Sequence, residues 1–235
     1  MKKRFAAFVS TVLAAVLCAC SAAPKDVLPN KAAQPTEAPT QQAQTTQAAP
    51  TEQPTPEPDL VQQLLEEMTL EQKVGQLFLV RPDSLDLSQT QDQINDAKAD
   101  GVTELTDAMR QTLAEYPVGG VVIFGKNLES PQQITQFLDD LQQASDTPLF
   151  TAIDEEGGLV ARLANNAAFD LPQYESAAAV GTSGNPEDAR AMGRTIGGYL
   201  KEYGFNLDFA PVADVNTNPD NPVIGTRAFS SEPQT

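Results

Sequence analysis

Three adjacent carboxylates, at residues 154–156, follow an apolar run and precede two glycines. Like charges side by side repel one another, so they require solvent, a cation or hydrogen-bond donors around them. Arg162 lies eight residues beyond Asp154 and is able to fold back onto it as a bidentate partner. The pattern therefore admits three interpretations: a solvated loop, a metal site, or a site in which carboxylates and a guanidinium hold the hydroxyls of a polyol.

Composition removes several other chemistries. The chain has 235 residues, with 15 basic and 32 acidic side chains and a net charge of −17. Such an acidic chain is a poor candidate for binding nucleic acid, which needs clustered lysine and arginine. It contains no histidine, which excludes Ser-His and Cys-His nucleophile systems built from these residues alone.

A second segment, residues 214–225, partly matches the pattern of a calcium-binding loop. Asp214, Asn216 and Asn218 match the first three ligand positions of such a loop. The sixth position is Pro219, where the turn needs glycine, and the twelfth is Gly225, where a bidentate glutamate is needed. We therefore reject a calcium site there, and the sequence predicts no metal and no cofactor.

The elements that must position these side chains alternate between strands and helices. Thr69 and Gln72 form a capping-box pair, and Ser130-Pro131 and Asn185-Pro186 are typical of helix starts. Residues 83–116 are polar and look like a partly helical insertion. The apolar patterns predict strands at 76–80, 118–124, 149–153 and 207–209, and helices at 60–67, after Thr69, from 131 and from 186.

This alternation predicts an α/β fold with a parallel sheet, either open or closed as a barrel. In both architectures, binding sites lie at the carboxyl ends of the strands. Asp154, Asn127 and Asp214 each follow a predicted strand. We therefore expect all three at one edge of the sheet.

The N-terminus reads as a targeting signal. Basic residues 2–4 precede an apolar stretch, 5–17, that is too short to favour a membrane-spanning helix. The following Leu-Cys-Ala-Cys resembles a bacterial lipoprotein box, which implies a signal peptide at 1–19 and a lipid on Cys20. An ordinary secretory signal is the alternative. We expect the protein to be lipid-anchored in the cell envelope, on the outer face of the cytoplasmic membrane or in the periplasm.

The next segment is a linker. Residues 20–58 are rich in proline, threonine, alanine and glutamine and contain no aromatic residue. Such a segment cannot bury enough apolar surface to offset its ordering entropy, so we predict a disordered stalk. Both cysteines of the chain, at 18 and 20, lie before residue 21, so the folded part at 59–235 has no disulfide.

Four stretches together resemble the N-terminal domain of glycoside hydrolase family 3. The D-x-E-G-G form of residues 154–158 suggests the β-N-acetylhexosaminidase branch of that family. The four stretches are MTLEQKVGQLFLV (68–80), VGGVVIFGKN (118–127), IDEEGGLVARL (153–163) and GFNLDFAPVADVNTNPDNPVIGTRAF (204–229).

The resemblance implies a (β/α)8 barrel that hydrolyses terminal β-linked N-acetylglucosamine, for example in cell-wall glycans, with retention. Asp154, Arg162 and Arg227 match family positions that hold the sugar hydroxyls. Glu155 and Glu156 are expected to be structural rather than catalytic, and the two glycines to let the chain turn beneath the sugar.

The family's lysine-histidine sugar-binding pair and its catalytic groups have no match in this chain. Its lysine-histidine pair, its acid/base pair and its aspartate nucleophile all lie downstream of the position of Arg227. Residues 59–235 are also fewer than the roughly 250 of a typical barrel. We therefore expect them to be part of a longer enzyme and to be inactive alone. A β-glucosidase or β-xylosidase of the same family, or a non-catalytic glycan-binding lipoprotein, remain alternatives.

Overall fold

The structure is a computed structural model that describes residues 59–234. The predicted signal peptide, Cys20 and the predicted linker lie outside the described residues. Within the described part of the chain, no helix is long and apolar enough to cross a membrane.

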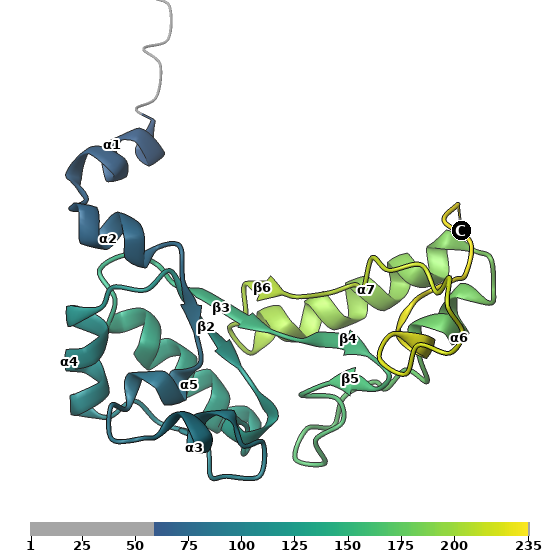
Figure 1. The fold of residues 1–235 in the computed structure, drawn as a ribbon, viewed down its shortest axis with the longest axis horizontal. Coiled ribbons are helices and arrows are strands. Elements are labelled where there is room, and N and C mark those ends of the chain that lie inside the picture. The colour runs from purple at the N-terminus through teal and green to yellow at the C-terminus, as the bar shows by residue number, and fades with distance from the viewer. Residues whose placement is uncertain (1–58, 235) are drawn as a thin grey trace, which may run out of the picture. The chain divides into compact units, whose positions relative to one another are not determined.

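Strands and helices alternate along the described residues (Figure 1). The helices are α1 (Leu60–Glu67), α2 (Leu70–Gly75), α3 (Gln91–Asn95), α4 (Asp107–Glu115), α5 (Pro131–Gln143), α6 (Ala177–Gly181) and α7 (Pro186–Glu202). The strands are β1 (Leu79–Val80), β2 (Gly120–Ile123), β3 (Phe150–Ile153), β4 (Glu155–Gly157), β5 (Val160–Ala161) and β6 (Leu207–Asp208). Short 3-10 turns η1 (Pro82–Leu85), η2 (Gly125–Asn127) and η3 (Gly225–Arg227) complete the set.

Four of the strands form one parallel sheet in the order β1-β2-β3-β6. This order follows the chain, so the sheet has no point at which the strand order reverses. Doubly wound sheets have such a reversal, whereas successive strands of a (β/α)8 barrel lie side by side in chain order. The predicted α/β class with a parallel sheet is confirmed, and its topology is that of consecutive barrel strands.

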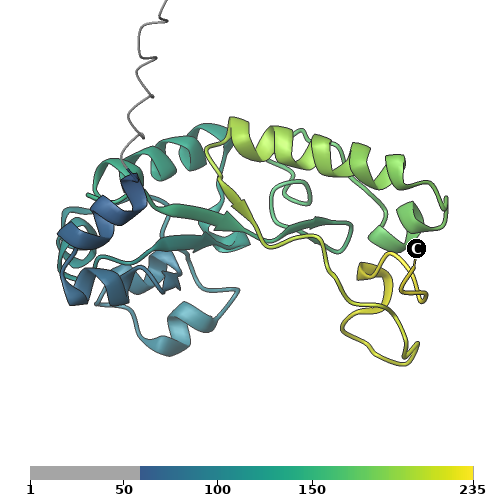
Figure 2. The same ribbon diagram turned by 90° about the horizontal axis from the view of Figure 1, so that it is seen from above.

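The crossover helices α5 and α7 cover the sheet, as the view from above shows (Figure 2). Helix α5 begins where the sequence predicts, because the Ser130 hydroxyl accepts a hydrogen bond from the Gln133 N–H and a proline occupies the first turn. Each helix turns one apolar stripe inward. The buried positions are Ile134, Phe137, Leu138 and Leu141 on α5, and Met192, Ile196, Tyr199 and Leu200 on α7.

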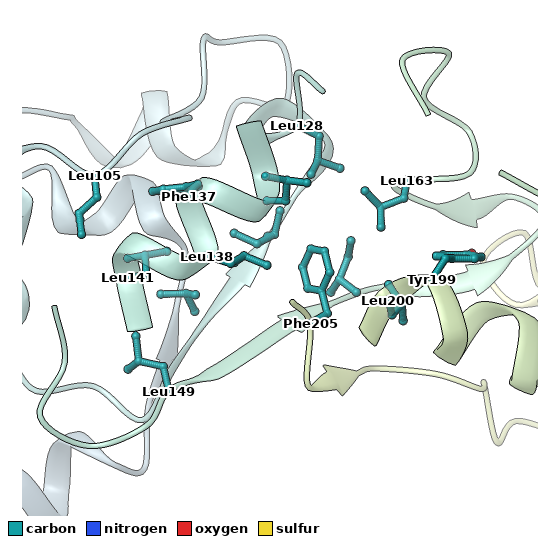
Figure 3. Close-up of a cluster of buried hydrophobic side chains, with 14 of the residues drawn as sticks. Leu105, Leu128, Phe137, Leu138, Leu141, Leu149, Leu163, Tyr199, Leu200 and Phe205 are labelled. Carbon is teal, nitrogen blue, oxygen red and sulfur yellow. The ribbon is translucent and has the colours of Figure 1, made fainter. Parts of the chain in front are cut away.

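These stripes meet strand side chains in one core (Figure 3). Val121, Ile123 and Ile153 from the sheet are at most 1% exposed. Burial of this kind contributes about 25 cal/mol per Å² of apolar surface. The core therefore fixes the sheet, and with it the residues that follow each strand.

The first strand is shorter than the predicted 76–80. Helix α2 has the predicted Thr69–Gln72 capping box, and its helical turns continue past its last residue. Leu77 N–H donates to the carbonyl of Val74, and Phe78 N–H donates to that of Gly75. Residues 76–78 therefore cannot extend, and β1 starts only at Leu79.

Candidate functional site

The carboxyl edge of the sheet gathers one polar or aromatic side chain per strand. Arg81 follows β1, Phe124 follows β2, Asp154 follows β3 and Phe209 follows β6. The Arg81 guanidinium lies 4.3 Å from the centre of the Phe124 ring, within the range of a cation–π contact. Side chains that follow neighbouring strands therefore meet at this edge, as parallel topology predicts.

Asp154 pairs with Arg162. Arg162 Nη2 donates to Asp154 Oδ2 at 3.1 Å, so the arginine does fold back, but through one contact rather than two. The two side chains are 28% and 33% exposed, which leaves both accessible to a ligand. Arg162 Nε is buried and has no hydrogen-bond partner among the described residues. The Arg162 guanidinium also lies 5.6 Å from the Phe124 ring centre.

The segment between these two residues is a small hairpin that the sequence patterns did not reveal. Strands β4 and β5 pair antiparallel with an irregular register. Gly157 and Gly158 occupy positive φ values of 83° and 69°, so the prediction that they turn the chain is confirmed. A Cβ on Gly157 would lie 2.3 Å from the Met192 methyl, and one on Gly158 would lie 2.8 Å from Cα of Ser176. The turn therefore packs against protein on that side.

Glu156 holds Arg227 by two hydrogen bonds. Arg227 Nε donates to Oε2 of Glu156 at 2.8 Å, and Nη2 donates to Oε1 at 2.6 Å. The Glu156 side chain is only 7% exposed, and that of Arg227 is 23% exposed. These hydrogen bonds raise the pKa of Arg227 above its ordinary value. The bidentate geometry fixes the plane of a guanidinium whose outer edge reaches solvent.

Glu155 is fully buried, at 0% exposure. Its carboxylate accepts hydrogen bonds from the N–H groups of Leu163 and Ala164, at 2.9 and 3.0 Å, and from the hydroxyl of Tyr199 at 2.8 Å. Burial and the neighbouring Glu155 charge raise the pKa of Tyr199 above its ordinary value. Three protein donors thus satisfy this carboxylate, and it is closed to solvent.

Asp208 is a further carboxylate of the cluster, which sequence reasoning missed. Its Oδ1 accepts from the Glu155 N–H at 3.0 Å. Burial raises the pKa of Asp208 to about 6, and the nearby charges of Glu155, Asp154 and Glu156 add to that rise. The only signal in the sequence was a charged residue inside an apolar strand run.

Asn127 does not join the site, although the sequence placed it at the same edge. It is fully buried and donates from Nδ2 to Asp83 and to the Val102 carbonyl, at 3.0 and 2.9 Å. Lys126 also pairs with Asp83, at 3.2 Å. Asn127 thus lies after β2 at the carboxyl edge, as predicted, but it anchors the segment after β1 rather than facing a ligand.

Asp214 is exposed and lines an open cavity of about 840 Å³. One wall of the cavity is the apolar side of α7 and the other is residues 210–215. Glu155, Glu156 and Asp208 also line it. Asp154, Arg162 and Arg227 do not line it. The cavity does not include the residues that the sequence assigned to the sugar, so we place the candidate site at Asp154 and Arg162 and not in this cavity. Among residues 59–234, no group of three or more histidine, cysteine, aspartate or glutamate side chains is arranged to hold a metal ion.

Comparison with known proteins gives a consistent result. The sequence model of the family described as "Glycosyl hydrolase family 3 N terminal domain" matches residues 69–235. The chain is 36% identical over 137 residues to a beta-hexosaminidase A of Pseudoalteromonas piscicida, covering 56% of this chain and 23% of that protein. It is 34% identical over 136 residues to a beta-hexosaminidase of Thiobacillus denitrificans, covering 56% and 37%.

Solved structures agree. A glycoside hydrolase family 3 beta-N-acetylglucosaminidase from Paenibacillus sp. str. FPU-7 superposes with a TM-score of 0.59 at 33% identity, covering 71% of this chain and 28% of that one. A beta-N-acetylhexosaminidase from Beutenbergia cavernae gives a TM-score of 0.54 at 27% identity, covering 70% and 46%. The chain thus spans less than half the length of each of these relatives.

Proposed function

Since this chain belongs to glycosyl hydrolase family 3 and carries that family's N-terminal domain, we propose that it forms the sugar-holding part of a β-N-acetylhexosaminidase. The complete enzyme would remove terminal β-linked N-acetylglucosamine from cell-wall or other glycans with retention. The names of the relatives described above support this substrate. No nucleic-acid partner and no cofactor form part of the proposal.

The observation that carries the proposal is the Asp154–Arg162 pair at the carboxyl edge of β3. A carboxylate accepts hydrogen bonds and a guanidinium donates them, so together they match the vicinal hydroxyls of a sugar ring. Both side chains are about one-third exposed, and Phe124 supplies an apolar surface beside Arg162. Arg227, fixed in orientation by Glu156, is the third sugar-binding residue that we propose.

The chemistry itself requires two further groups. Retaining hydrolysis needs a nucleophilic carboxylate and a separate acid/base group. Glu155 is enclosed by protein donors, and Glu156 is committed to Arg227. We therefore assign neither role to these residues and propose that both groups come from outside residues 59–234.

Nitrophenyl glycosides test the proposal on the polypeptide that contains this domain. We expect hydrolysis of the β-N-acetylglucosaminide well above that of the β-glucoside and β-xyloside. Asp154→Asn and Arg162→Lys should each lower kcat/KM by about tenfold to a hundredfold, which corresponds to the loss of one charge-assisted hydrogen bond. Glu187→Gln, on the exposed side of α7, is the control and should leave kcat/KM unchanged.

The alternatives give different results in the same assay. A preference for the glucoside or xyloside would replace the proposed substrate with that of another branch of the family. Sugar binding without any hydrolysis would favour the glycan-binding lipoprotein. If the protein neither binds nor hydrolyses any of the three sugars, the proposal is overturned.

We also propose that the mature protein is attached to the cell envelope through a lipid on Cys20. The basic residues 2–4, the short apolar stretch and the Leu-Cys-Ala-Cys sequence support this. Labelling cells with a radioactive fatty acid should mark the wild-type protein and leave Cys20→Ser unlabelled. A wild-type protein free of label would favour the ordinary secretory signal, whereas labelling of Cys20→Ser would show that the lipid is on another residue.

A further inference from the structure

Glu155 lies on strand β4, and its carboxylate contacts the chain that follows strand β5, the other strand of the hairpin. Its Oε2 accepts from the Leu163 N–H and its Oε1 from the Ala164 N–H. These two residues directly follow Arg162. The side chain of Glu155 therefore fixes the backbone from which the Arg162 side chain extends.

The backbone of Glu155 fixes the other half of the pair. Its N–H donates to Oδ1 of Asp208 at 3.0 Å, at the end of the neighbouring strand β6. Asp154 directly precedes this N–H, so its position is tied to the sheet. Glu155 thus forms the hydrogen bonds that fix the backbone next to both Asp154 and Arg162.

Tyr199 orients the Glu155 side chain. Its hydroxyl donates to Oε1 at 2.8 Å from within α7, and the contact is buried. Figure 3 shows Tyr199 and Leu163 at the same end of the core. The Tyr199 ring is held by that core, so the direction of its hydroxyl is set by helix packing.

The hairpin ladder alone cannot provide this rigidity. Strands β4 and β5 share only the Cα pairs Glu155–Ala161 and Gly157–Val160, with a register shift between them. Arg162 lies beyond the last of these pairs. The chain where Arg162 leaves the hairpin is held by the hydrogen bonds to Glu155, together with those from Asn165 to Gly158 and from Gln173 to Ala164.

We infer that Glu155 is a positioning residue for the Asp154–Arg162 pair, and that Tyr199 holds Glu155 in place for that task. The inference rests on the proposed function, because it takes the pair to be sugar-binding. Holding a hydrogen-bonding group in one geometry before the ligand arrives increases affinity, since less freedom is lost on binding. Glu155 itself remains closed to the ligand.

The test uses Glu155→Gln and Tyr199→Phe in the full chain, with Tyr203→Phe as the matched control. Tyr203 also belongs to the end of α7, but its ring packs edge-on against Phe169. Three quantities are measured below the melting temperature of every variant. They are the NMR signal of the Arg162 Nε–H group, the hydrogen-exchange rates of the Leu163 and Ala164 amides, and the affinity for N-acetylglucosamine.

We expect both variants to accelerate exchange at the two amides by about tenfold and to shift or broaden the Arg162 signal, because each loses a buried hydrogen bond. Affinity for the sugar should fall by about threefold to tenfold. The double variant should differ from the sum of the single ones, whereas Tyr203→Phe should combine additively with either. The milder Tyr199→Phe decides the matter if Glu155→Gln does not fold.

Unchanged exchange and an unchanged Arg162 signal in both variants would overturn the inference, whatever the sugar affinity. Altered signals with unchanged sugar affinity would also overturn it, because the contact would then be structural only. If the wild-type chain fails to bind the sugar while the Arg162 signal responds to both variants, the proposed function fails and the positioning of the pair stands.

Discussion

The guanidinium of Arg227 and the carboxylate of Glu156 face each other in a bidentate contact across 71 residues of sequence. Glu156 belongs to the hairpin after β3, and Arg227 ends the 3-10 turn η3. The contact therefore attaches the segment after β6 to the hairpin that carries the Asp154–Arg162 pair. Two arginines that the sequence assigned to one ligand are thereby held by the same short hairpin.

Glu156→Gln should weaken this attachment. An amide keeps one acceptor but loses the charge and the second acceptor, so we expect the free energy of unfolding to fall by about 1–2 kcal/mol. Arg227 is partly exposed and stays hydrated, which limits the loss. Urea denaturation at pH 7 measures the change.

Glu187→Gln is the control for this prediction. Glu187 pairs with Arg190 at 3.3 Å, but both side chains are at least 60% exposed. Exposed pairs of this kind contribute about 0–1 kcal/mol. An equal effect of the two substitutions would mean that the Glu156–Arg227 contact does not persist in solution.

Asp208 should make stability depend on pH in a defined direction. Its pKa is raised to about 6, with burial as the largest cause. A carboxyl with a raised pKa binds its proton more tightly in the folded protein, so its contribution is most favourable below about pH 4 and is lost as pH rises through 6. Asp208→Asn removes this dependence and keeps an oxygen that accepts from the Glu155 N–H.

We therefore expect Asp208→Asn to be more stable than the wild type above pH 6. The gain should be about 1–2 kcal/mol, which allows for the solvent screening of a half-buried group. Thermal unfolding of both proteins between pH 4 and 8 gives the difference, which should vanish toward pH 4. A constant difference across this range would contradict the raised pKa.

The sequence predicted the helices better than the strand ends. Capping residues such as Thr69 and Ser130 act within four positions of themselves, so their effect is readable locally. The end of α2 carries no comparable signal in the sequence. The shortening of β1 depends on helical hydrogen bonds that continue to Phe78, and residues 76–80 form an apolar run that suits a strand equally well.

The site was also predictable only where its residues lie in a short motif or close together in the sequence. Asp154, Arg162 and Arg227 were found by motif, and the contact of the first two follows from their spacing. The partners of Glu155 and Glu156 were not predictable, because Tyr199 and Arg227 lie 44 and 71 residues away in sequence. The burial of Asn127 was not predictable either, because a position at the end of a strand does not reveal whether the side chain is covered by another segment.

The network that covers Asn127 supplies a third prediction. Lys126 is 6% exposed and pairs with the fully buried Asp83, while its ammonium also donates to the carbonyls of Gln93 and Ile94. Lys126→Met leaves the Asp83 charge without its cation, so we expect a loss of about 3–5 kcal/mol. Thermal or urea unfolding at pH 7 measures it.

Arg110→Met is the matched substitution on the surface. Arg110 lies 3.7 Å from Asp140, and the two side chains are 39% and 29% exposed. Its loss should change stability by less than about 1 kcal/mol. If Lys126→Met proves equally mild, the buried pair is not formed as described.

The last prediction ranks how strongly alanine substitutions at the two glycines of the hairpin, Gly157 and Gly158, destabilise the protein. Both have positive φ, so alanine is strained at each. At Gly157 the new Cβ meets the end of the flexible Met192 side chain, whereas at Gly158 it meets the backbone of Ser176. A side chain moves aside more readily than a backbone, so Gly158→Ala should be the more damaging.

We expect Gly157→Ala to lower the free energy of unfolding by about 1–2 kcal/mol and Gly158→Ala by about 2–4 kcal/mol. Gly193→Ala is the control, because Gly193 lies within α7 and a Cβ there meets nothing within 4 Å. It should stabilise the protein by about 0.5–1 kcal/mol, since alanine favours a helix over glycine. Urea denaturation ranks the three, and a tolerated Gly158→Ala would mean that the hairpin does not pack against the start of α6.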